Sequence, residues 1–495
     1  MSLSSTDRRG PTIGHAALLF LACLLLHGAG TWSVPLIDRD EPRFAEASRE
    51  MRERGDYVVP YFNNQYRFDK PPLIYWAQVA SYYCLGENDF AARFPSMVAA
   101  ALTAVLLFAW GRRLGNARVG WWAAIIFSLC LQIFLHGKAA LPDMWLVFFV
   151  TAAHWAAYEL IADSLGQGSR PTRAGYRKYW QLAFYLALAF AFLAKGPIGW
   201  IPLLTVASTK LFLRDQPLNP QFRFATGMLG TLAVVLAWGI PALLRTNGEF
   251  FRVGIGHHIF ERAVGTSFER QEANSALIYF VTLPFYFLAV FVSFFPWSIK
   301  LPALIRQLWR RRDGIDNYLI AGIVPIFLIL TFVNTKFFHY TLPAFPLLSL
   351  LLARHLFALP GSPRFAPRAA VAALTVFLCT ALFLFPFFAR VVPSVQLFKK
   401  SRGDLRPEME FANVGYRQPS VVWYFRSHVH GWFRTLDPAS VHMFMDSPGA
   451  RFVILPTRTA HELYPTLPQT WKSFSAQGFL PPRGKRLDFT LILKP

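Results

Sequence analysis

Residues 14–57 read GHAALLFLACLLLHGAGTWSVPLIDRDEPRFAEASREMRERGDY, an apolar run that leads directly into a cluster of acidic residues. The apolar part, 14–31, is about as long as a helix that crosses a bilayer. Similar runs recur along the chain, at 93–111, 119–136, 144–163, 179–194, 197–213, 224–243, 277–298, 317–333, 338–353 and 369–388. The sequence therefore predicts an all-α polytopic membrane protein with about eleven transmembrane helices.

The amino-acid composition agrees with a membrane protein. Hydrophobic residues make up 54% of the 495-residue chain and charged residues only 16%, whereas a soluble domain usually carries about 25% charged residues. The formal net charge of +22 would suit a protein that binds nucleic acid. However, Lys and Arg lie mainly in short loops between apolar runs, where membrane topology explains them. We therefore predict contact with membrane lipid and no nucleic-acid partner.

The distribution of Lys and Arg predicts the orientation of the apolar runs. With the N-terminus inside, each short inside loop carries three or more Lys and Arg, and each short outside loop carries one. This orientation places two long loops outside, 32–92 and 245–276. It also places residues 390–495 outside, after a transmembrane domain that we predict over residues 1–389.

Residues 390–495 have the pattern of a small α/β domain. Three runs in it are typical of strands: SVVWYF (420–425), RFVILP (451–456) and FTLILK (489–494). Between two of them, DPASVHMFMDS (437–447) is typical of a short helix. We therefore predict an extracytoplasmic α/β domain at this end of the chain.

The first outer loop is predicted to contain amphipathic helices. Pro42 suits the first turn of a helix, and Gly55 suits its end. Apolar residues between them fall near one face and charged residues cover the rest, so we expect a helix over 42–54 that lies on the membrane surface with mostly solvated charges. Asp38 precedes this helix and is interpreted as part of a plain loop.

Carboxylates and cations gather at the predicted outer ends of the spans. The candidate residues are Asp40, Glu41, Arg43, Asp69, Lys70, Asp143, Lys195, His258, Arg262 and Tyr340. Charged residues are expensive at such positions and therefore tend to be functional. The combination suits transfer of a sugar from a phosphate, because a carboxylate can take the proton of an acceptor hydroxyl while cations hold the departing phosphate.

These residues also have structural interpretations that spacing alone leaves open. Asp40 or Glu41 could cap the helix that follows. Asp143 could cap the fourth span, and Lys195 could extend its charge from a span end toward water. Asp69 could simply pair with its neighbour in a proline turn.

Several motifs occur in the order found in one enzyme family. They are DRDEPRFAEASREM (38–51), RFDKPP (67–72), ALPDMWLVFF (140–149), FLAKGPIGW (192–200), HHIFERAVG (257–265) and KFFHYTLPAFPLL (336–348). The pattern resembles that of the polyprenyl-phosphate-dependent glycosyltransferases of the GT-C type. Within that family it is similar to the bacterial aminoarabinose lipid A transferases and the protein O-mannosyltransferase-like group.

The resemblance implies an inverting glycosyltransferase in the bacterial inner membrane, with its active site facing the periplasm. Its donor would be a sugar on a polyprenyl phosphate, and its acceptor lipid A, another glycolipid, a polysaccharide or a protein. Asp40, Glu41 and Asp143 match catalytic positions of the family, with Asp40 as the base.

The resemblance also implies positions that bind the donor. Phosphate-binding or substrate-binding positions are matched by Arg43, Lys70, Lys195, Arg262 and Tyr340, although Tyr340 stands before the Leu-Pro pair rather than within the family's usual motif. Asp69 and His258 match a pair that could hold a divalent metal ion, with Asp69 replacing the longer Glu of the aminoarabinose enzymes.

A lipid or glycan transporter is the alternative function. A transporter would place charges in the centres of its spans and often shows symmetry between its two halves. In this sequence the charges gather at span ends and the halves show no repeat. The pattern therefore favours a transferase.

Overall fold

The computed structural model describes residues 13–165, 174–250, 252–254, 282–333, 336–480 and 485–495. His258 and Arg262 lie outside these residues, as does much of the predicted outer loop 245–276. The chain forms two compact units. Unit 1 comprises Met1–Gly28, Phe68–Ile74 and Phe94–Leu378, and unit 2 comprises Ala29–Arg67, Tyr75–Arg93 and Cys379–Pro495. The first outer loop thus belongs largely with the C-terminal segment, while the predicted domain boundary at residue 389 stays a prediction.

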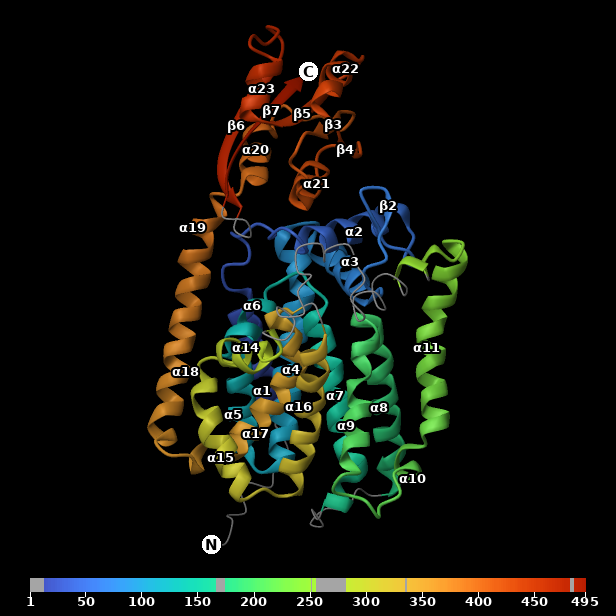
Figure 1. Cartoon of the computed structure of the whole chain (residues 1–495), viewed down its shortest axis with the longest axis vertical. Coiled ribbons are helices and arrows are strands. Elements are labelled where there is room, and N and C mark those ends of the chain that lie inside the picture. The colour runs from blue at the N-terminus through green and yellow to red at the C-terminus, as the bar shows by residue number, and fades with distance from the viewer. Residues whose placement is uncertain (1–12, 166–173, 251, 255–281, 334–335, 481–484) are drawn as a thin grey trace. The chain divides into compact units, whose positions relative to one another are not determined.

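Unit 1 is built from helices (Figure 1). Its longer helices are α1 (Ile13–Gly28), α4 (Asp89–Leu114, from Phe94 onward), α5 (Ala117–Ser128), α7 (Asp143–Ile161), α8 (Ala174–Lys195), α9 (Ile201–Thr209), α11 (Phe224–Arg245), α14 (Phe285–Ser293), α15 (Leu301–Arg310), α16 (Gly314–Phe332), α17 (Phe345–His355) and α18 (Ser362–Cys379). Short helices in the described part of the unit include α6 (Leu131–His136), η3 (Pro197–Trp200), α10 (Asn219–Phe222) and η7 (Phe338–Ala344).

A polytopic membrane protein is confirmed, but the predicted count of eleven spans is not. Among the described residues, six helical segments are long and apolar enough to cross a membrane, and a bent pair could form a seventh. The bent pair turns by 117° between Phe285–Ser293 and Trp297–Arg310. Other predicted runs form apolar helices of only 10–17 residues, such as Ile13–Gly28 and Pro197–Thr209, which are shorter than a typical transmembrane helix.

Polar contacts join several helices in the interior of unit 1. The Nε2 atom of His154 on α7 lies 2.9 Å from Oγ1 of Thr205 on α9. The hydroxyl of Tyr318 on α16 donates to the carbonyl of His154 at 2.6 Å. Interhelical hydrogen bonds of this kind stabilise membrane helices that have little hydrophobic driving force between them.

Unit 2 contains a mixed five-stranded sheet. Its strands are β3 (Glu410–Asn413), β4 (Phe433–Thr435), β5 (Arg451–Pro456), β6 (Lys472–Leu480) and β7 (Lys485–Lys494), in the order β4-β3-β5-β7-β6. The strand β3 runs parallel to both β4 and β5, whereas β7 is antiparallel to β5 and β6. A short hairpin of β1 (Tyr61–Phe62) and β2 (Gln65–Tyr66) forms a separate sheet.

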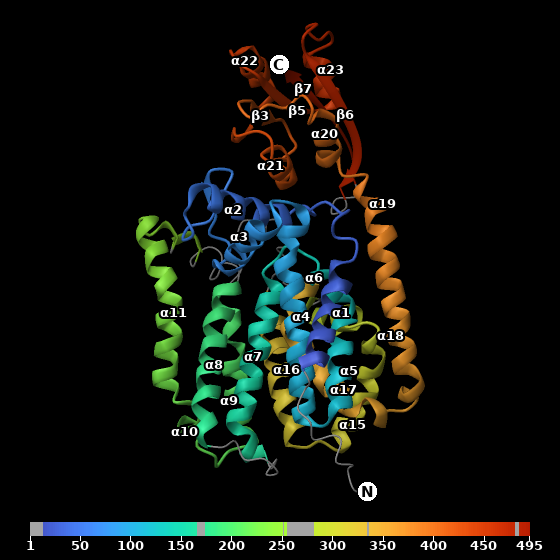
Figure 2. The same cartoon turned by 180° about the vertical axis from the view of Figure 1, so that it is seen from behind.

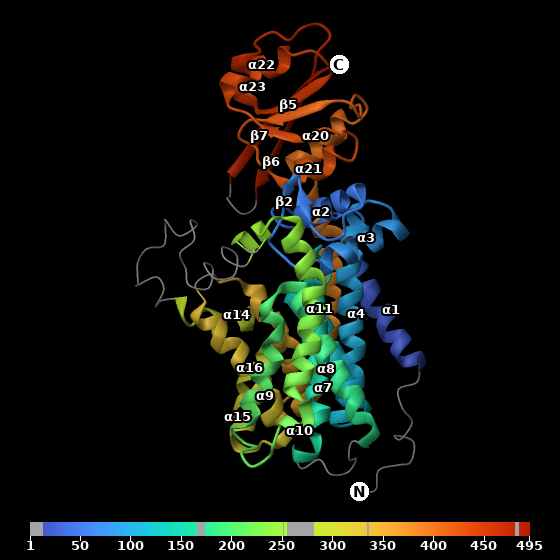
Figure 3. The ribbon, with the colours of Figure 1, turned by 90° about the vertical axis from the view of Figure 1, so that its right-hand side faces the viewer.

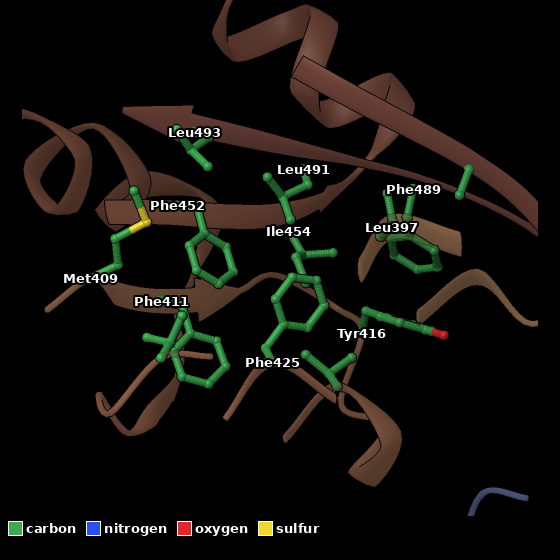
Figure 4. Close-up of a cluster of buried hydrophobic side chains, with 13 residues drawn as sticks. Leu397, Met409, Phe411, Tyr416, Phe425, Phe452, Ile454, Phe489, Leu491 and Leu493 are labelled. Atoms are coloured by element: carbon green, nitrogen blue, oxygen red, sulfur yellow. The ribbon is translucent and has the colours of Figure 1, made fainter. Parts of the chain in front are cut away.

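Helices cover both faces of the five-stranded sheet. They are α20 (Pro393–Ser401), α21 (Pro419–Phe425), α22 (Val441–Asp446) and α23 (Thr457–Leu463), and Figure 3 shows α20 and α21 on one side and α22 and α23 on the other. Phe452 and Ile454 of β5 point into one core (Figure 4). Val453 and Leu455 point into the other. The continuous apolar run of β5 therefore reflects a strand that is buried on both faces.

The predicted α/β domain is confirmed, with one error. The runs at 451–456 and 489–494 form strands, and 437–447 contains a helix, as predicted. The run at 420–425 is wrong as a strand, because it forms α21. Pro419 provides a helical φ at the first helical position, and a short apolar run that is buried all round does not distinguish a helix from a strand.

The predicted surface helix of the first outer loop is also partly wrong. The helix exists as α2 (Glu41–Arg54), ends at Gly55 in the left-handed conformation, and is followed by α3 (Leu73–Leu85). Its central charges are not solvated, because the side chains of Glu46 and Glu50 are fully buried and that of Arg49 is only 2% exposed, whereas Glu53 and Arg54 at its end are exposed. Each of the three buried residues has an ion-pair partner within unit 2, so α2 is an internal helix of that unit.

Candidate active site

An ion pair between Asp143 and Lys195 forms the centre of a polar cluster in unit 1. Asp143 begins α7, and Lys195 ends the neighbouring helix α8. The Nζ atom of Lys195 donates to Oδ1 of Asp143 at 2.5 Å, and both side chains are largely buried. The structure thus brings together two of the predicted site residues, because the start of α7 lies beside the end of α8.

Apolar packing holds this ion pair in position. Leu146 and Val150 on α7 pack against Ala191 and Ala194 on α8, one to two turns from the two charges. After Lys195, Gly196 adopts a φ of +79°, which favours glycine. The chain then turns at Pro197 into η3, so the lysine lies at a sharply defined helix end.

Tyr340 and His339 lie close to the pair. The ring of Tyr340, on η7, lies 5.4 Å from Nζ of Lys195, within the range of a cation–π interaction. His339 interacts electrostatically with Asp143, Lys195 and Lys70. The predicted residues Asp143, Lys195 and Tyr340 therefore form one cluster in unit 1, and the charge of Lys70 acts on His339 at its edge.

His136 is an additional member of the cluster, and no role was predicted for it from the sequence. Its ring lies 5.1 Å from that of His339, and it also interacts electrostatically with Asp143. His136 ends α6, directly after an apolar run. The sequence feature that could have identified His136 as a site residue was its position, as a polar residue at the predicted outer end of a span.

The acidic segment of the first outer loop belongs to unit 2, where Glu41 forms a buried ion pair with Arg93. Its carboxylate accepts from Nε and Nη2 of Arg93 at 3.0 and 2.8 Å, and from the backbone amide of Ile37 at 2.7 Å. Only 4% of Glu41 is exposed. Arg93 also donates to the carbonyls of Val34 and Pro35, so this guanidinium orders the segment that leads to Asp40.

Asp40 differs from Glu41 in both exposure and bonding. It is exposed and stands at the N-cap of α2, yet its side chain makes no capping hydrogen bond. Its carbonyl accepts from the amides of Arg43 and Phe44 at 3.0 and 3.2 Å, so the backbone alone starts the helix. The structural interpretation of Asp40 as a side-chain cap is therefore wrong, and its carboxylate is accessible to a substrate.

Asp38, predicted to lie in a plain loop, is bonded to the C-terminal part of unit 2. Its carboxylate accepts from the amide and the hydroxyl of Ser420 at 2.8 and 2.5 Å. Burial raises the pKa of Asp38 to about 6, although the Ser420 bonds and the charge of Arg43 act in the opposite direction. The partner lies 382 positions away in the sequence, which leaves no local signal for this contact.

This raised pKa predicts a pH-dependent stability. Because folded Asp38 binds its proton more tightly than the unfolded chain does, the Tm of the wild type should fall relative to that of Asp38→Asn as pH rises from about 4 to about 6. Thermal unfolding of both proteins in detergent across this range provides the measurement. Other titrating groups are common to both proteins, so a constant difference in Tm would contradict the raised pKa.

The predicted metal pair has no further support in the described residues. Asp69 is half-buried, and the carbonyl of this residue accepts from Nζ of Lys70 at 3.0 Å. Its proposed partner His258 lies outside the described residues, as does Arg262. Within residues 13–165, 174–250, 252–254, 282–333, 336–480 and 485–495, no group of three or more His, Cys, Asp or Glu could hold a metal ion.

Comparisons with known proteins identify relatives in sequence. A family model described as dolichyl-phosphate-mannose-protein mannosyltransferase matches residues 15–216. The chain is 30% identical over 320 residues to undecaprenyl phosphate-alpha-4-amino-4-deoxy-L-arabinose arabinosyl transferase 2 of Sodalis glossinidius, covering 64% of this chain and 55% of that protein. Identity to the corresponding transferase of Pectobacterium atrosepticum is 29% over 340 residues, covering 68% and 57%. The chain thus spans about half the length of the curated relatives it matches.

A solved structure shows the same fold. ArnT from Cupriavidus metallidurans bound to undecaprenyl phosphate matches 97% of this chain and 98% of its own, with a TM-score of 0.74 and 18% sequence identity. The predicted resemblance and the predicted fold type are confirmed by these matches. None of the matches described here supports the transporter alternative.

Proposed function

We propose that this chain, which is related in sequence and in fold to the GT-C glycosyltransferases, moves a sugar from a polyprenyl phosphate to an acceptor, with inversion. The observation that carries the proposal is the ion pair of Asp143 and Lys195 at two helix ends in unit 1, with the ring of Tyr340 beside Lys195. The relatives in sequence are named as transferases that use an undecaprenyl phosphate sugar, and the solved structure contains undecaprenyl phosphate. Both support this class of donor.

The cluster can stabilise a departing phosphate. When the bond between the sugar and the phosphate breaks, negative charge develops on the phosphate oxygens, and fixed cations nearby lower the energy of that state. Lys195 and Lys70 are the cations, and Tyr340 provides a further contact. Asp143 fixes the position of the Lys195 ammonium group through their hydrogen bond.

Asp40 is proposed as the base that accepts the proton of the acceptor hydroxyl. Its exposed carboxylate is not used to cap α2, which leaves both oxygens for a substrate. Glu41 would act through Arg93 by ordering the segment before Asp40 rather than by touching the substrate. Arg43, half-buried near the start of α2, is proposed as a substrate-binding residue.

The membrane arrangement remains part of the proposal. We propose that the chain crosses the bacterial inner membrane about eleven times, with its N-terminus inside and the active site facing the periplasm. The acceptor is proposed to be lipid A, another glycolipid, a polysaccharide or a protein. Arg262 as a phosphate ligand, and a divalent metal at Asp69 and His258, also remain proposals, and no step of the reaction is assigned to a metal.

A transfer assay tests the proposed reaction. Purified chain in detergent is mixed with radiolabelled sugars on polyprenyl phosphate and with lipid A, polysaccharide or protein acceptors. We expect label to move to one acceptor class. Failure of every pair, together with movement of a fluorescent polyprenyl phosphate across proteoliposomes, would support the transporter and overturn the proposal.

Lys195→Met is predicted to lower kcat by about 10²-fold, because the charge that develops on the phosphate loses its closest fixed cation. Lys195→Arg, which keeps the charge, should retain more activity than Lys195→Met. Because Lys195→Met also leaves Asp143 unpaired in a buried position, the double variant Lys195→Met/Asp143→Asn serves to control for folding. Steady-state kinetics with saturating acceptor provide the measurement, and wild-type kcat in a folded Lys195→Met protein would contradict the role.

A further inference from the structure

A groove of about 310 Å³ lies between α8 and α11 in unit 1. Its walls are mainly apolar, with Leu182 and Leu186 on α8 and Phe222 just before α11, while Gln181 and Arg223 line it at one end. Figures 1 and 2 show α11 beside α8 at one edge of this unit. The span Phe224–Arg245 is apolar enough to cross a membrane, and only 22% of its most apolar 18-residue window is buried, so we expect this edge of unit 1 to meet lipid.

The base of the groove is fixed by close contacts between the two helices. A Cβ atom on Gly227 would collide with the ring of Tyr185, so the glycine lets this ring lie against the backbone of α11. The Tyr185 hydroxyl donates to the carbonyl of Phe222 at 3.0 Å, and Thr231 Oγ1 donates to the carbonyl of Tyr185 at 3.1 Å. Gly230, in contrast, has open space where a side chain would be.

One end of the groove is strongly basic. Arg223 lines it and is exposed, and Arg177 and Lys178 are exposed near the start of α8. The segment before α11 lies beside α8 about two turns after the start of α8, because Nε2 of Gln181 donates to the carbonyl of Gln221 at 2.6 Å. Residues 174–186 and 219–231 contain no Asp or Glu, so cations at this end face no acidic side chain from either segment.

We propose that this groove binds one anionic phospholipid, with its phosphate at Arg223 and an acyl chain along the apolar walls. A basic pocket between membrane helices is the arrangement that recognises anionic headgroups. A small polar ligand would leave Leu182 and Leu186, which are 58% and 40% exposed, without apolar partners in the groove. A neutral lipid would leave Arg223, the cation among the lining residues, without a counter-charge.

The groove is separate from the cluster that we assign to the donor phosphate. Gln181, at the basic end, and Lys195 are 14 residues apart on α8, which places them roughly 21 Å apart along the helix axis. A phosphate at Arg223 would therefore not be the one at Lys195. The proposal does not depend on the proposed transferase activity.

Native mass spectrometry of the full chain tests the proposal, with phosphatidylglycerol and phosphatidylcholine as probes. We expect one phosphatidylglycerol to be retained in preference to phosphatidylcholine. Arg223→Asn, which tolerates the φ of +54° at this position, should weaken that binding about fivefold, and Arg223→Lys should largely preserve it.

A pair of glycine variants supplies the matched control. Gly230→Leu fills the groove and should abolish the retained lipid, whereas Gly239→Leu should not, since Gly239 also has open space on α11 but does not line the groove. Equal retention in both variants, or equal retention of the two lipids, would overturn the proposal. Displacement of phosphatidylglycerol by polyprenyl phosphate in wild type but not in Gly230→Leu would assign the groove to the carrier instead, and would also overturn it.

Discussion

Asp40→Asn is expected to reduce kcat for sugar transfer by about 10²–10⁴-fold, the usual contribution of a general base. Asn has nearly the same shape as Asp but cannot accept the proton of the acceptor hydroxyl. The folded state should be little affected, because the Asp40 side chain is exposed and does not cap α2. Transfer kinetics and the Tm in detergent, measured on the same preparation, separate catalysis from folding.

Asp437→Asn is the matched control for this prediction. Asp437 is also an exposed N-cap residue whose side chain makes no capping bond, although its helix, Pro438–Ser440, is only three residues long, so the substitution removes the same charge from another exposed carboxylate. It should leave kcat unchanged. A fully active Asp40→Asn protein would exclude Asp40 as the base.

Glu41→Gln should behave differently from both. This change weakens a buried pair with Arg93, so we expect lower stability and a smaller folded fraction rather than a loss of kcat per folded molecule. The comparison separates the two neighbouring carboxylates, which the sequence pattern placed together in one motif.

Features with a local or periodic signal were predicted correctly from the sequence. Long apolar runs identified the membrane class, and the strand at 451–456 has the bounds that the structure gives it. The polar residues at the ends of α7 and α8 were expected to lie close to one another, and Asp143 and Lys195 do form an ion pair. Each of these inferences depends on the hydropathy of a segment, or on a charged residue at the end of an apolar run, where burying the charge costs free energy.

Features that depend on distant partners were not predicted. The charges of α2 looked solvated because their partner Arg426 lies 380 positions from Glu46. Asp38 looked like a loop residue for the same reason, since Ser420 is equally distant in the sequence. Periodicity describes one helix at a time, so it does not reveal that a second element covers the polar face.

Arg426→Met is expected to destabilise unit 2 by about 3 kcal/mol, because removal of one partner leaves buried carboxylates without their counter-charge. The Arg426 side chain is 3% exposed and forms ion pairs with Glu46 and Glu50, both fully buried, and with Glu53 at 2.8 Å. The expected loss is at the lower end of the range for such pairs, since Arg49 still pairs with Glu46 at 2.7 Å. Chemical unfolding in detergent, followed by tryptophan fluorescence, measures it.

Arg458→Met provides the control, because it removes the same charge from a side chain that is 91% exposed and pairs with Glu462 one helical turn away. Exposed pairs of this kind contribute about 0.5 kcal/mol or less. Adding Glu46→Gln to Arg426→Met should restore part of the lost stability, since the buried carboxylate is then neutral. If Arg426→Met and Arg458→Met lowered the free energy of unfolding by similar amounts, the buried ion-pair network would be contradicted. That result would instead support the prediction from periodicity, in which α2 is a surface helix with solvated charges.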